Sequence, residues 1–241
     1  MISFYLFRSE LYCNSASRQS KGVKILYYCP YQNHFRSPEV NPSPPAHYRL
    51  LHAVPTAPPV DIYINGSLVA KALRYANFTS YFRASPGSYD VKIFPSGKKD
   101  KALLETSLQL SAGNIYTVAA IGDSKNISLL PINEPHVSQV KNYTSVRFSH
   151  LSPNAPALDI SLPDGKNLFK DVKYKQTTDY LSLPQGHYTI QAKQAGTNKV
   201  LLIVPNIHLL PNKIYTIYAI GLLNGKPPIQ VLIPLDGSTY L

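Results

Sequence analysis

The sequence predicts an all-β protein that contains two tandem β-sandwich domains. The first observation is a long repeat: the stretch His52–Asp61 (HAVPTAPPVD) returns as His150–Asp159 (HLSPNAPALD), with His, Pro, Ala, Pro and Asp at identical spacing. The two stretches lie 98 residues apart. A period this long indicates two copies of a whole domain, because solenoid units are usually roughly 20 to 50 residues long. The second is composition, with 18 Tyr, 21 Pro, one Met and no Trp, which favours strands and turns over helices. The third is a series of short apolar or alternating segments separated by turn signals.

The two copies agree well beyond this opening motif and define the predicted domains. We expect an N-terminal tail and Pro-rich linker over residues 1–46, a first β-sandwich over 47–136 and a second over 145–241. The matched positions are Tyr75 and Tyr174, Tyr81 and Tyr180, Gly87-Ser-Tyr89 and Gly186-His-Tyr188, Ile115-Tyr-Thr117 and Ile214-Tyr-Thr216, and Ala120-Ile-Gly122 and Ala219-Ile-Gly221.

The first domain should contain about seven short strands. Asn65-Gly66 is a strong hairpin signal, Tyr89, Val91 and Ile93 alternate with polar residues, and Ile115–Ile121 is apolar enough to be covered on both faces. The predicted strands are Tyr48–His52, Val60–Ile64, Val69–Leu73, Ser88–Phe94, Leu103–Leu110, Ile115–Ile121 and, closing the domain, Ile127–Leu130, and Thr79–Arg83 leads into a turn at Ser85-Pro-Gly87.

The second domain should repeat this order of strands and turns. Its second strand is followed by a turn at Pro163-Asp-Gly165, and no segment shows a sustained helical period. The predicted strands are Val146–Ser149, Leu158–Leu162, His187–Gln191, Val200–Val204, Ile214–Ile220 and Ile229–Ile233.

The chain is basic, with a formal net charge of +11 from 24 Lys and Arg against 13 Asp and Glu. The excess is spread over the tail and both domains, so there is no basic arm. Such a surface attracts polyanions through general electrostatics. A merely basic protein is the simpler interpretation, and no specific nucleic-acid motif is present.

The first residues carry an apolar run, Ile2–Phe7, that is shorter than a signal-peptide core and has no basic residues before it. No stretch approaches the roughly 20 apolar residues that span a bilayer as a helix. We therefore expect no transmembrane segment and no clear export signal.

Two polar residue types recur in the repeated motif, and both invite a functional interpretation. His52 with Asp61, and His150 with Asp159, would be metal or ligand pairs. Two ligands are too few for a stable metal site, and Asp61 and Asp159 are the only carboxylates we expect to recur at matched positions. We therefore expect the motif to be structural, with Asp accepting N–H groups in an Asx-turn and His satisfying carbonyls. Its prolines, which stiffen the loop, include Pro55, Pro58, Pro153 and Pro156.

Cys13, Cys29 and His34 leave three interpretations open: inert thiols, a disulfide and a zinc site. The close C-x2-C pair typical of zinc sites is missing, which disfavours the zinc site. The sequence also lacks the G-x-S-x-G, phosphate-loop and H-E-x-x-H motifs. A glycosidase would need two carboxylates in one site. We therefore expect no cofactor, no metal and no enzymatic activity.

The repeated motif H-x-x-P-x-A-P-x-[VL]-D, the Gly-x-Tyr turn and the I-Y-T-x-x-A-I-G strand resemble the bacterial domain-of-unknown-function family 4397. The resemblance covers residues 48–236. It implies tandem immunoglobulin-like or transthyretin-like modules of the kind common in bacterial surface and secreted proteins, and it implies no chemistry.

Two functional hypotheses follow from these observations. The first is a non-catalytic structural or adhesive module of a bacterial cell envelope or spore surface. Its partners would be cell-wall or spore-surface polymers or other envelope proteins. The second is a carbohydrate- or polyanion-binding module that uses Tyr side chains and the Lys-rich surface, although a Tyr present in both copies more often packs in a core. The expected location is the cell envelope, the spore surface or the exterior, with the cytoplasm as the alternative.

Overall fold

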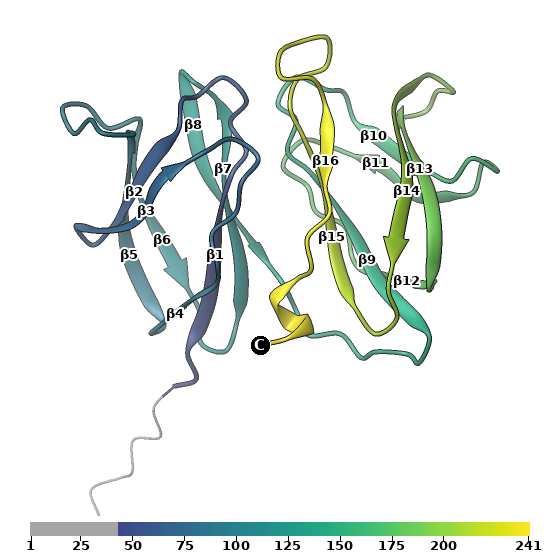
Figure 1. Cartoon of the computed structure of the whole chain (residues 1–241), viewed down its shortest axis with the longest axis horizontal. Coiled ribbons are helices and arrows are strands. Elements are labelled where there is room, and N and C mark those ends of the chain that lie inside the picture. Colours follow the sequence, from purple (N-terminus) through teal and green to yellow (C-terminus); the bar gives the residue numbers. More distant parts are fainter. Residues whose placement is uncertain (1–42) are drawn as a thin grey trace, which may run out of the picture. The chain divides into compact units, whose positions relative to one another are not determined.

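The computed structural model describes residues 43–241, of which residues 46–241 carry all of the regular structure. The fold is all-β, with four sheets of four strands that form two tandem sandwiches (Figure 1). Cys13, Cys29 and His34, for which three interpretations were left open, lie outside the described residues. The sandwiches belong to one compact unit, Pro42–Leu241.

The first repeat contains eight strands in two sheets, with strand orders β4-β1-β7-β8 and β3-β2-β5-β6. The first and seventh strands run parallel, and the other neighbours are antiparallel. The strands are β1 (Ala46–His52), β2 (Val60–Ile64), β3 (Ser67–Leu73), β4 (Phe82–Ala84), β5 (Gly87–Pro95), β6 (Leu104–Leu110), β7 (Ile115–Asp123) and β8 (Asn126–Asn133).

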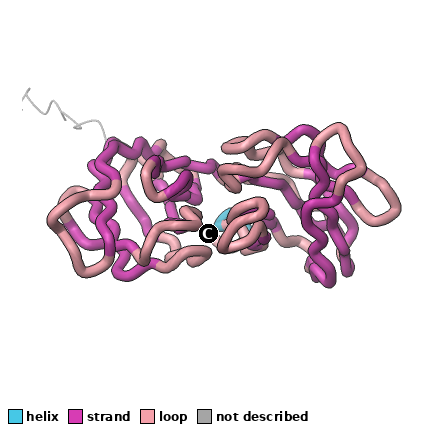
Figure 2. The backbone as a smooth tube through the Cα atoms, turned by 90° about the horizontal axis from the view of Figure 1, so that it is seen from above, coloured by secondary structure: helices cyan, strands magenta, loops and turns pink. Residues whose placement is uncertain are grey.

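The second repeat has the same topology, with strand orders β12-β9-β15-β16 and β11-β10-β13-β14. One short 3-10 helix near the C-terminus is the only helical element among the described residues (Figure 2). The elements are β9 (Tyr143–His150), β10 (Leu158–Ser161), β11 (Asn167–Val172), β12 (Leu181–Pro184), β13 (Gly186–Gln194), β14 (Val200–Leu209), β15 (Ile214–Ile220), β16 (Gln230–Leu232) and η1 (Gly237–Thr239).

The predicted count of about seven strands per copy is one short. The additional elements are brief edge strands such as β4, which has three residues. Several strands also extend beyond their predicted ends: β14 continues to Leu209, past a register shift opposite Tyr188 and Ile190. Bulges interrupt the period-two pattern on which the sequence prediction depends, so the prediction stopped early.

Local predictions that depend on turn chemistry and alternation are confirmed. Asn65 and Gly66 both have positive φ, and Ile64 pairs with Ser67 across the two-residue turn, as expected for a tight hairpin. In β5, Val91 and Ile93 are buried while the alternating polar residues Asp90 and Lys92 are exposed.

Each sandwich has its own apolar core, and a third apolar cluster lies between the repeats. β7 and β15 are buried along their apolar length, as predicted for strands covered on both faces. The inner face of each packs in its sandwich. The outer faces contribute to the third cluster, whose buried members are Leu51, Ala53, Ala119, Ile121, Ile132, Leu151, Tyr218 and Ile220. The other repeat therefore covers the outer face of each central strand.

Candidate functional site

The repeated motif forms the crossover from one sheet to the other, between β1 and β2 and again between β9 and β10. His52 is buried at the end of β1, where its Nε2 lies 3.1 Å from the Pro58 carbonyl oxygen and its Nδ1 accepts the Val54 N–H at 3.3 Å. Pro55 is buried, whereas Pro58 is exposed. The histidine ring thus bridges the two ends of the proline loop.

The second copy reproduces this arrangement residue by residue. His150 Nε2 lies 3.0 Å from the Pro156 carbonyl oxygen, and Nδ1 accepts the Ser152 N–H at 3.3 Å. Pro153 and Pro156 are half-buried. Burial lowers the pKa of His52 and of His150 below the usual value. The backbone contacts require the neutral ring, because an Nδ1 that accepts an N–H cannot carry a proton.

Each motif aspartate joins two turns of the second sheet. Asp61 accepts the Ala72 N–H at 2.7 Å and the Gly97 N–H at 2.9 Å. Ala72 has φ of 50°, a left-handed conformation that costs a non-glycine residue about 1–2 kcal/mol. These two backbone bonds lower the pKa of the Asp61 carboxyl. The carboxylate therefore stabilises a strained bulge in β3.

Asp159 makes the equivalent bonds, to the N–H of Asp171 at 2.7 Å and of Gly196 at 3.1 Å. The expected Asx-turn is wrong in both copies, since the backbone N–H groups that donate to the aspartates lie more than ten positions away along the chain. A sequence motif shows the carboxylate but gives no means to locate partners that the sheet brings to it.

The most unusual polar feature is a buried charge network that the sequence analysis missed. Arg49 in β1 and Arg147 in β9 are each only 4% exposed, and Glu134 and Asp236 are fully buried. Each arginine donates through Nε to a threonine of the neighbouring parallel strand: Arg49 to Thr117 at 2.7 Å, and Arg147 to Thr216 at 2.8 Å.

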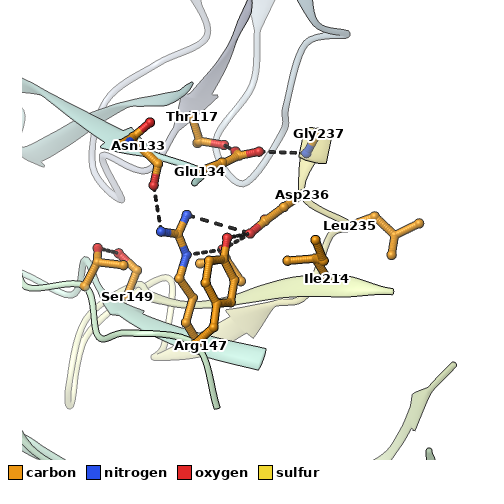
Figure 3. A network of polar contacts seen from close by, with 12 residues as sticks. Thr117, Asn133, Glu134, Arg147, Ser149, Ile214, Leu235, Asp236 and Gly237 are labelled. Atoms are coloured by element: carbon orange, nitrogen blue, oxygen red, sulfur yellow. Dashed lines mark hydrogen bonds and ion pairs between the residues drawn. The ribbon is translucent and has the colours of Figure 1, made fainter. Parts of the chain in front are cut away.

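The network connects the two repeats reciprocally. Arg49 donates to the carbonyl of Leu235 at 2.9 Å. Arg147 donates to the carbonyl of Asn133 at 2.6 Å (Figure 3). Each acceptor directly precedes the carboxylate of the other repeat. Each repeat therefore donates a hydrogen bond to the equivalent position of the other repeat, which is the pattern of a two-fold symmetric interface.

Charges and hydrogen bonds together hold the two carboxylates. Arg49 lies 3.4 Å from Glu134 and 3.5 Å from Asp236, while Arg147 lies 3.7 Å from Asp236. The Gly237 N–H donates to Glu134 at 2.7 Å, across the repeats. Burial, reinforced by the charge of Glu134, raises the pKa of Asp236 to about 6.

Two repeated tyrosines complete the network. Tyr81 donates to both carboxylate oxygens of Glu134, at 2.9 and 2.7 Å, and Tyr180 donates to Asp236. Their rings also lie against the guanidinium groups, with 4.8 Å from Arg49 Cζ to the Tyr81 centroid. Burial raises the pKa of both hydroxyls, so they act as hydrogen-bond donors.

Glu134 and Asp236 correct the prediction that only Asp61 and Asp159 recur as carboxylates. Glu134 N–H donates to the Ile115 carbonyl and Asp236 N–H to the Ile214 carbonyl, which are matched positions of the repeat. The extra residues near the end of the second copy displaced them in the sequence comparison. The sequence did carry one signal of the buried network: in each copy an arginine lies three residues before the motif histidine, within an apolar strand.

The other repeated tyrosines also have structural partners. Tyr89 donates to the Ser85 carbonyl at 2.6 Å and Tyr188 to the Pro184 carbonyl at 2.7 Å. Tyr75 and Tyr174 pack edge-on against the two motif histidines. This arrangement favours a core role for the tyrosines present in both copies.

A different tyrosine, without a counterpart in the second repeat, lies on the outer face of the β2–β5 pair. The Tyr63 and Phe94 rings meet edge to face with centroids 5.6 Å apart, and the Lys99 ammonium lies 4.7 Å from the Tyr63 centroid. Tyr63 and Phe94 are half-buried and Lys99 is exposed. This pair offers an aromatic surface beside a cation.

Beside the network, a groove of about 370 Å³ is lined by both repeats, including Asn133, Arg147, Lys175 and Asp179.

Over residues 43–241, no group of three or more His, Cys, Asp or Glu side chains is placed to hold a metal ion. No helix in this same range is long and apolar enough to cross a membrane.

Comparisons with known proteins identify the family. The family model described as a domain of unknown function, DUF4397, matches residues 46–161 and 162–237. No curated protein matches the chain. Among solved structures, the chain is similar to the Bacillus anthracis TIE protein, with 12% identity over 75% of this chain and 34% of the other, and a TM-score of 0.24. This chain thus spans about a third of that protein.

A second similar structure is described as "Alpha-glucan binding by a streptococcal virulence factor". It has 10% identity over 81% of this chain and 99% of the other, with a TM-score of 0.25. The family match covers most of the chain, from the start of β1 to the start of η1, and includes both copies of the motif. The chain belongs to the DUF4397 family.

Proposed function

We propose that this chain is a non-catalytic structural or adhesive module of a bacterial cell envelope or spore surface. Its polar side chains that recur in both copies bond within the fold. His52 and Asp61 hold backbone groups of the first repeat, and Arg49 and Arg147 hold the opposite repeat. Residues used in this way support a mechanical role.

The observation that carries the proposal is the reciprocal arginine contact between the repeats. Each arginine side chain is buried and reaches a backbone carbonyl of the other sandwich, at 2.9 and 2.6 Å. Because breaking a buried charged contact costs several kcal/mol, the joint resists bending. A stiff joint suits a module that holds a fixed distance between an envelope and what is attached to it.

The proposed partners are cell-wall or spore-surface polymers or other envelope proteins, and the net charge of +11 would favour anionic ones. The test is a pull-down by the tagged full-length chain from isolated cell wall, spore coat and nucleic acid, at low and high salt, together with localisation of the tagged chain in cells. We expect retention on wall or coat material and a surface location.

The proposal would be wrong if the chain were found only in the cytoplasm and bound nucleic acid tightly. A hydrolase activity that disappears in Asp61→Ala or Asp159→Ala would also contradict it. The Asp90→Ala variant is a suitable control, since Asp90 is an exposed aspartate on β5.

A second candidate is a carbohydrate- or polyanion-binding module, favoured by the Tyr63–Phe94 pair with Lys99 above it. Stacking of a sugar on Tyr63 would respond little to salt. Binding through Lys99 and other lysines would weaken steeply as salt rises, because screening is strong beyond about 10 Å at 0.1 M.

Soluble glucan and a linear polyphosphate, titrated against the parent, Tyr63→Ala and Lys99→Gln at 50 and 300 mM salt, separate these modes. Tyr143→Ala is the control, since Tyr143 is an exposed tyrosine on a different strand. Equal binding by all variants would contradict a site at Tyr63.

A further inference from the structure

The two repeats differ in side-chain size at one pair of equivalent positions beside their interface. In the first repeat Leu51 lies opposite Phe78 in a short antiparallel bridge, and in the second repeat Ser149 lies opposite Thr177 in the same bridge. The Ser149 and Thr177 hydroxyl oxygens are 2.9 Å apart. Two large apolar side chains in one copy are thus replaced by two small hydroxyl side chains in the other.

This difference gives the two buried arginines different neighbours. Arg49 has two rings against its guanidinium group, with its Cζ 4.7 Å from the Phe78 centroid and 4.8 Å from the Tyr81 centroid. Among residues 43–241, only one ring lies against Arg147 in this way, that of Tyr180 at 4.6 Å. The second repeat therefore lacks the ring that Phe78 supplies in the first.

The groove of about 370 Å³ lies where this ring is lacking, because Arg147 and Thr177 both line it. Pro131 and Pro135 of the first repeat contribute to its apolar wall, and Thr177 and Thr178 of the second repeat contribute to its polar wall. Arg147 already has a carboxylate partner, with Asp236 at 3.7 Å. The groove thus offers a guanidinium group and apolar surface without an unbalanced charge that would select an anion.

From this comparison we propose that the groove binds a neutral aromatic side chain, Phe or Tyr, of a partner polypeptide. The face of an aromatic ring carries negative potential, which complements a guanidinium group within about 6 Å of the ring centroid. The ring would lie beside Arg147 as Phe78 lies beside Arg49. The volume is at the lower end of the range of about 300–1,000 Å³ for ligand pockets, which suits a single ring with its flanking backbone.

This site goes beyond the proposed envelope role. It specifies a contact with another polypeptide, made by a groove of the folded chain, and it depends neither on where the chain is located nor on which polymer retains it. It also belongs to one side of the interface alone, since Phe78 takes the equivalent position on the other side.

The first test titrates the full-length chain with N-acetyl-phenylalanine amide, a neutral aromatic probe, and follows the NMR signals of the protein. N-acetyl-leucine amide and glucose are the comparison probes. We expect shift changes centred on residues 130–135 and 175–179, nuclear Overhauser effects between the probe ring and the Thr177 methyl group, and at least tenfold weaker binding of the leucine probe. Shift changes that spare the groove, equal binding of the two amides, or binding of glucose alone would each overturn the proposal.

The second test fills the groove from within. Thr177→Phe gives the second repeat the side chain that the first repeat has, and it should abolish binding of the aromatic probe. Thr106→Phe, which adds a ring at an exposed position of β6, should bind the probe like the parent. Binding by Thr177→Phe with the affinity of the parent would contradict the site. If Thr177→Phe does not fold, the Overhauser effects to Thr177 in the parent decide between the outcomes alone.

Discussion

At the scale of single residues, the repeated motif was partly predictable. The sequence identifies His52, Asp61 and their counterparts, and turn chemistry suggests that they bind backbone groups. The partners of Asp61, at Ala72 and Gly97, were not predictable because sheet pairing brings them together. Arg49 and Glu134 were missed because a buried charge is recognised by its partner, and this partner lies partly in the other repeat.

Replacing Asp61 by Ala should destabilise the first repeat. The change leaves two backbone N–H groups without their acceptor, and we expect a loss of about 1–2 kcal/mol in the free energy of unfolding. Urea unfolding followed by circular dichroism measures it. Asp159→Ala should behave similarly, and Asp90→Ala, the exposed control, should unfold like the parent.

Protonation of the motif histidines should make stability depend on pH. The pKa of His52 and of His150 is lowered in the folded chain, so the unfolded chain binds protons more tightly. Their contribution to stability is full above the unfolded pKa of about 6.5. It is lost as the pH falls through the folded values, by at most about 1.4 kcal/mol per pH unit for each histidine.

Urea unfolding between pH 5 and 7.5 tests this dependence in the parent and in His52→Gln/His150→Gln. The difference between the two chains should shrink as the pH falls, and His136→Gln is the control. The raised pKa of Asp236, about 6, has the opposite sign: its contribution is present below about 3.8 and is lost as the pH rises through 6. It cancels in the difference, and a pH-independent difference would contradict the histidine account.

At the scale of elements, the strongest predictions concerned strands with uninterrupted patterns. Ile115–Ile121 and Ile214–Ile220 read as strands covered on both faces, and both are buried throughout. The sequence could not say what covers the second face. Short edge strands such as β4 lack enough residues to show a period, and bulges such as the one in β14 hide it.

The glycine that ends each repeated Ala-Ile-Gly segment should not tolerate a side chain. Gly122 has φ of 106°, and an added Cβ would lie 2.1 Å from the Asn126 carbonyl oxygen. Gly221 is equivalent, with 2.2 Å to the Pro228 carbonyl oxygen. Gly122→Ala should therefore lower the unfolding free energy by about 2 kcal/mol or more.

Thermal melting measures the effect of Gly122→Ala. Gly66→Ala is a useful comparison, since Gly66 also has positive φ but has open space where its Cβ would lie. Gly66→Ala should lose only the part of the unfolding free energy that a non-glycine residue costs at positive φ. Equal losses in the two variants would show that contact with the Asn126 carbonyl does not limit this position.

At the scale of the whole molecule, the repeats behave in the structure as one unit. A shared apolar cluster and the reciprocal arginine contacts join the two sandwiches. The repeat in the sequence predicted two domains, because internal similarity reports on each copy alone. Contact between the copies depends on which outer-face residues of one sandwich pack against the other. A single sequence does not show that pairing.

Arg147→Met should weaken the joint by leaving the Asn133 carbonyl and part of the Asp236 charge without a partner. Removing one member of a buried charged group costs about 3–5 kcal/mol. Denaturant unfolding should detect this loss, and Arg83→Met, at an exposed arginine on β4, should have little effect. A loss below about 1 kcal/mol would mean that the contact behaves like a surface ion pair.

The central claim is that buried reciprocal contacts make one mechanical unit of the two repeats. Differential scanning calorimetry of the full-length chain tests it most directly, because two-state unfolding gives equal calorimetric and van't Hoff enthalpies. We predict a single transition with equal enthalpies in the parent, and separation into two transitions in Arg49→Met/Arg147→Met. Two independent transitions in the parent would contradict the account.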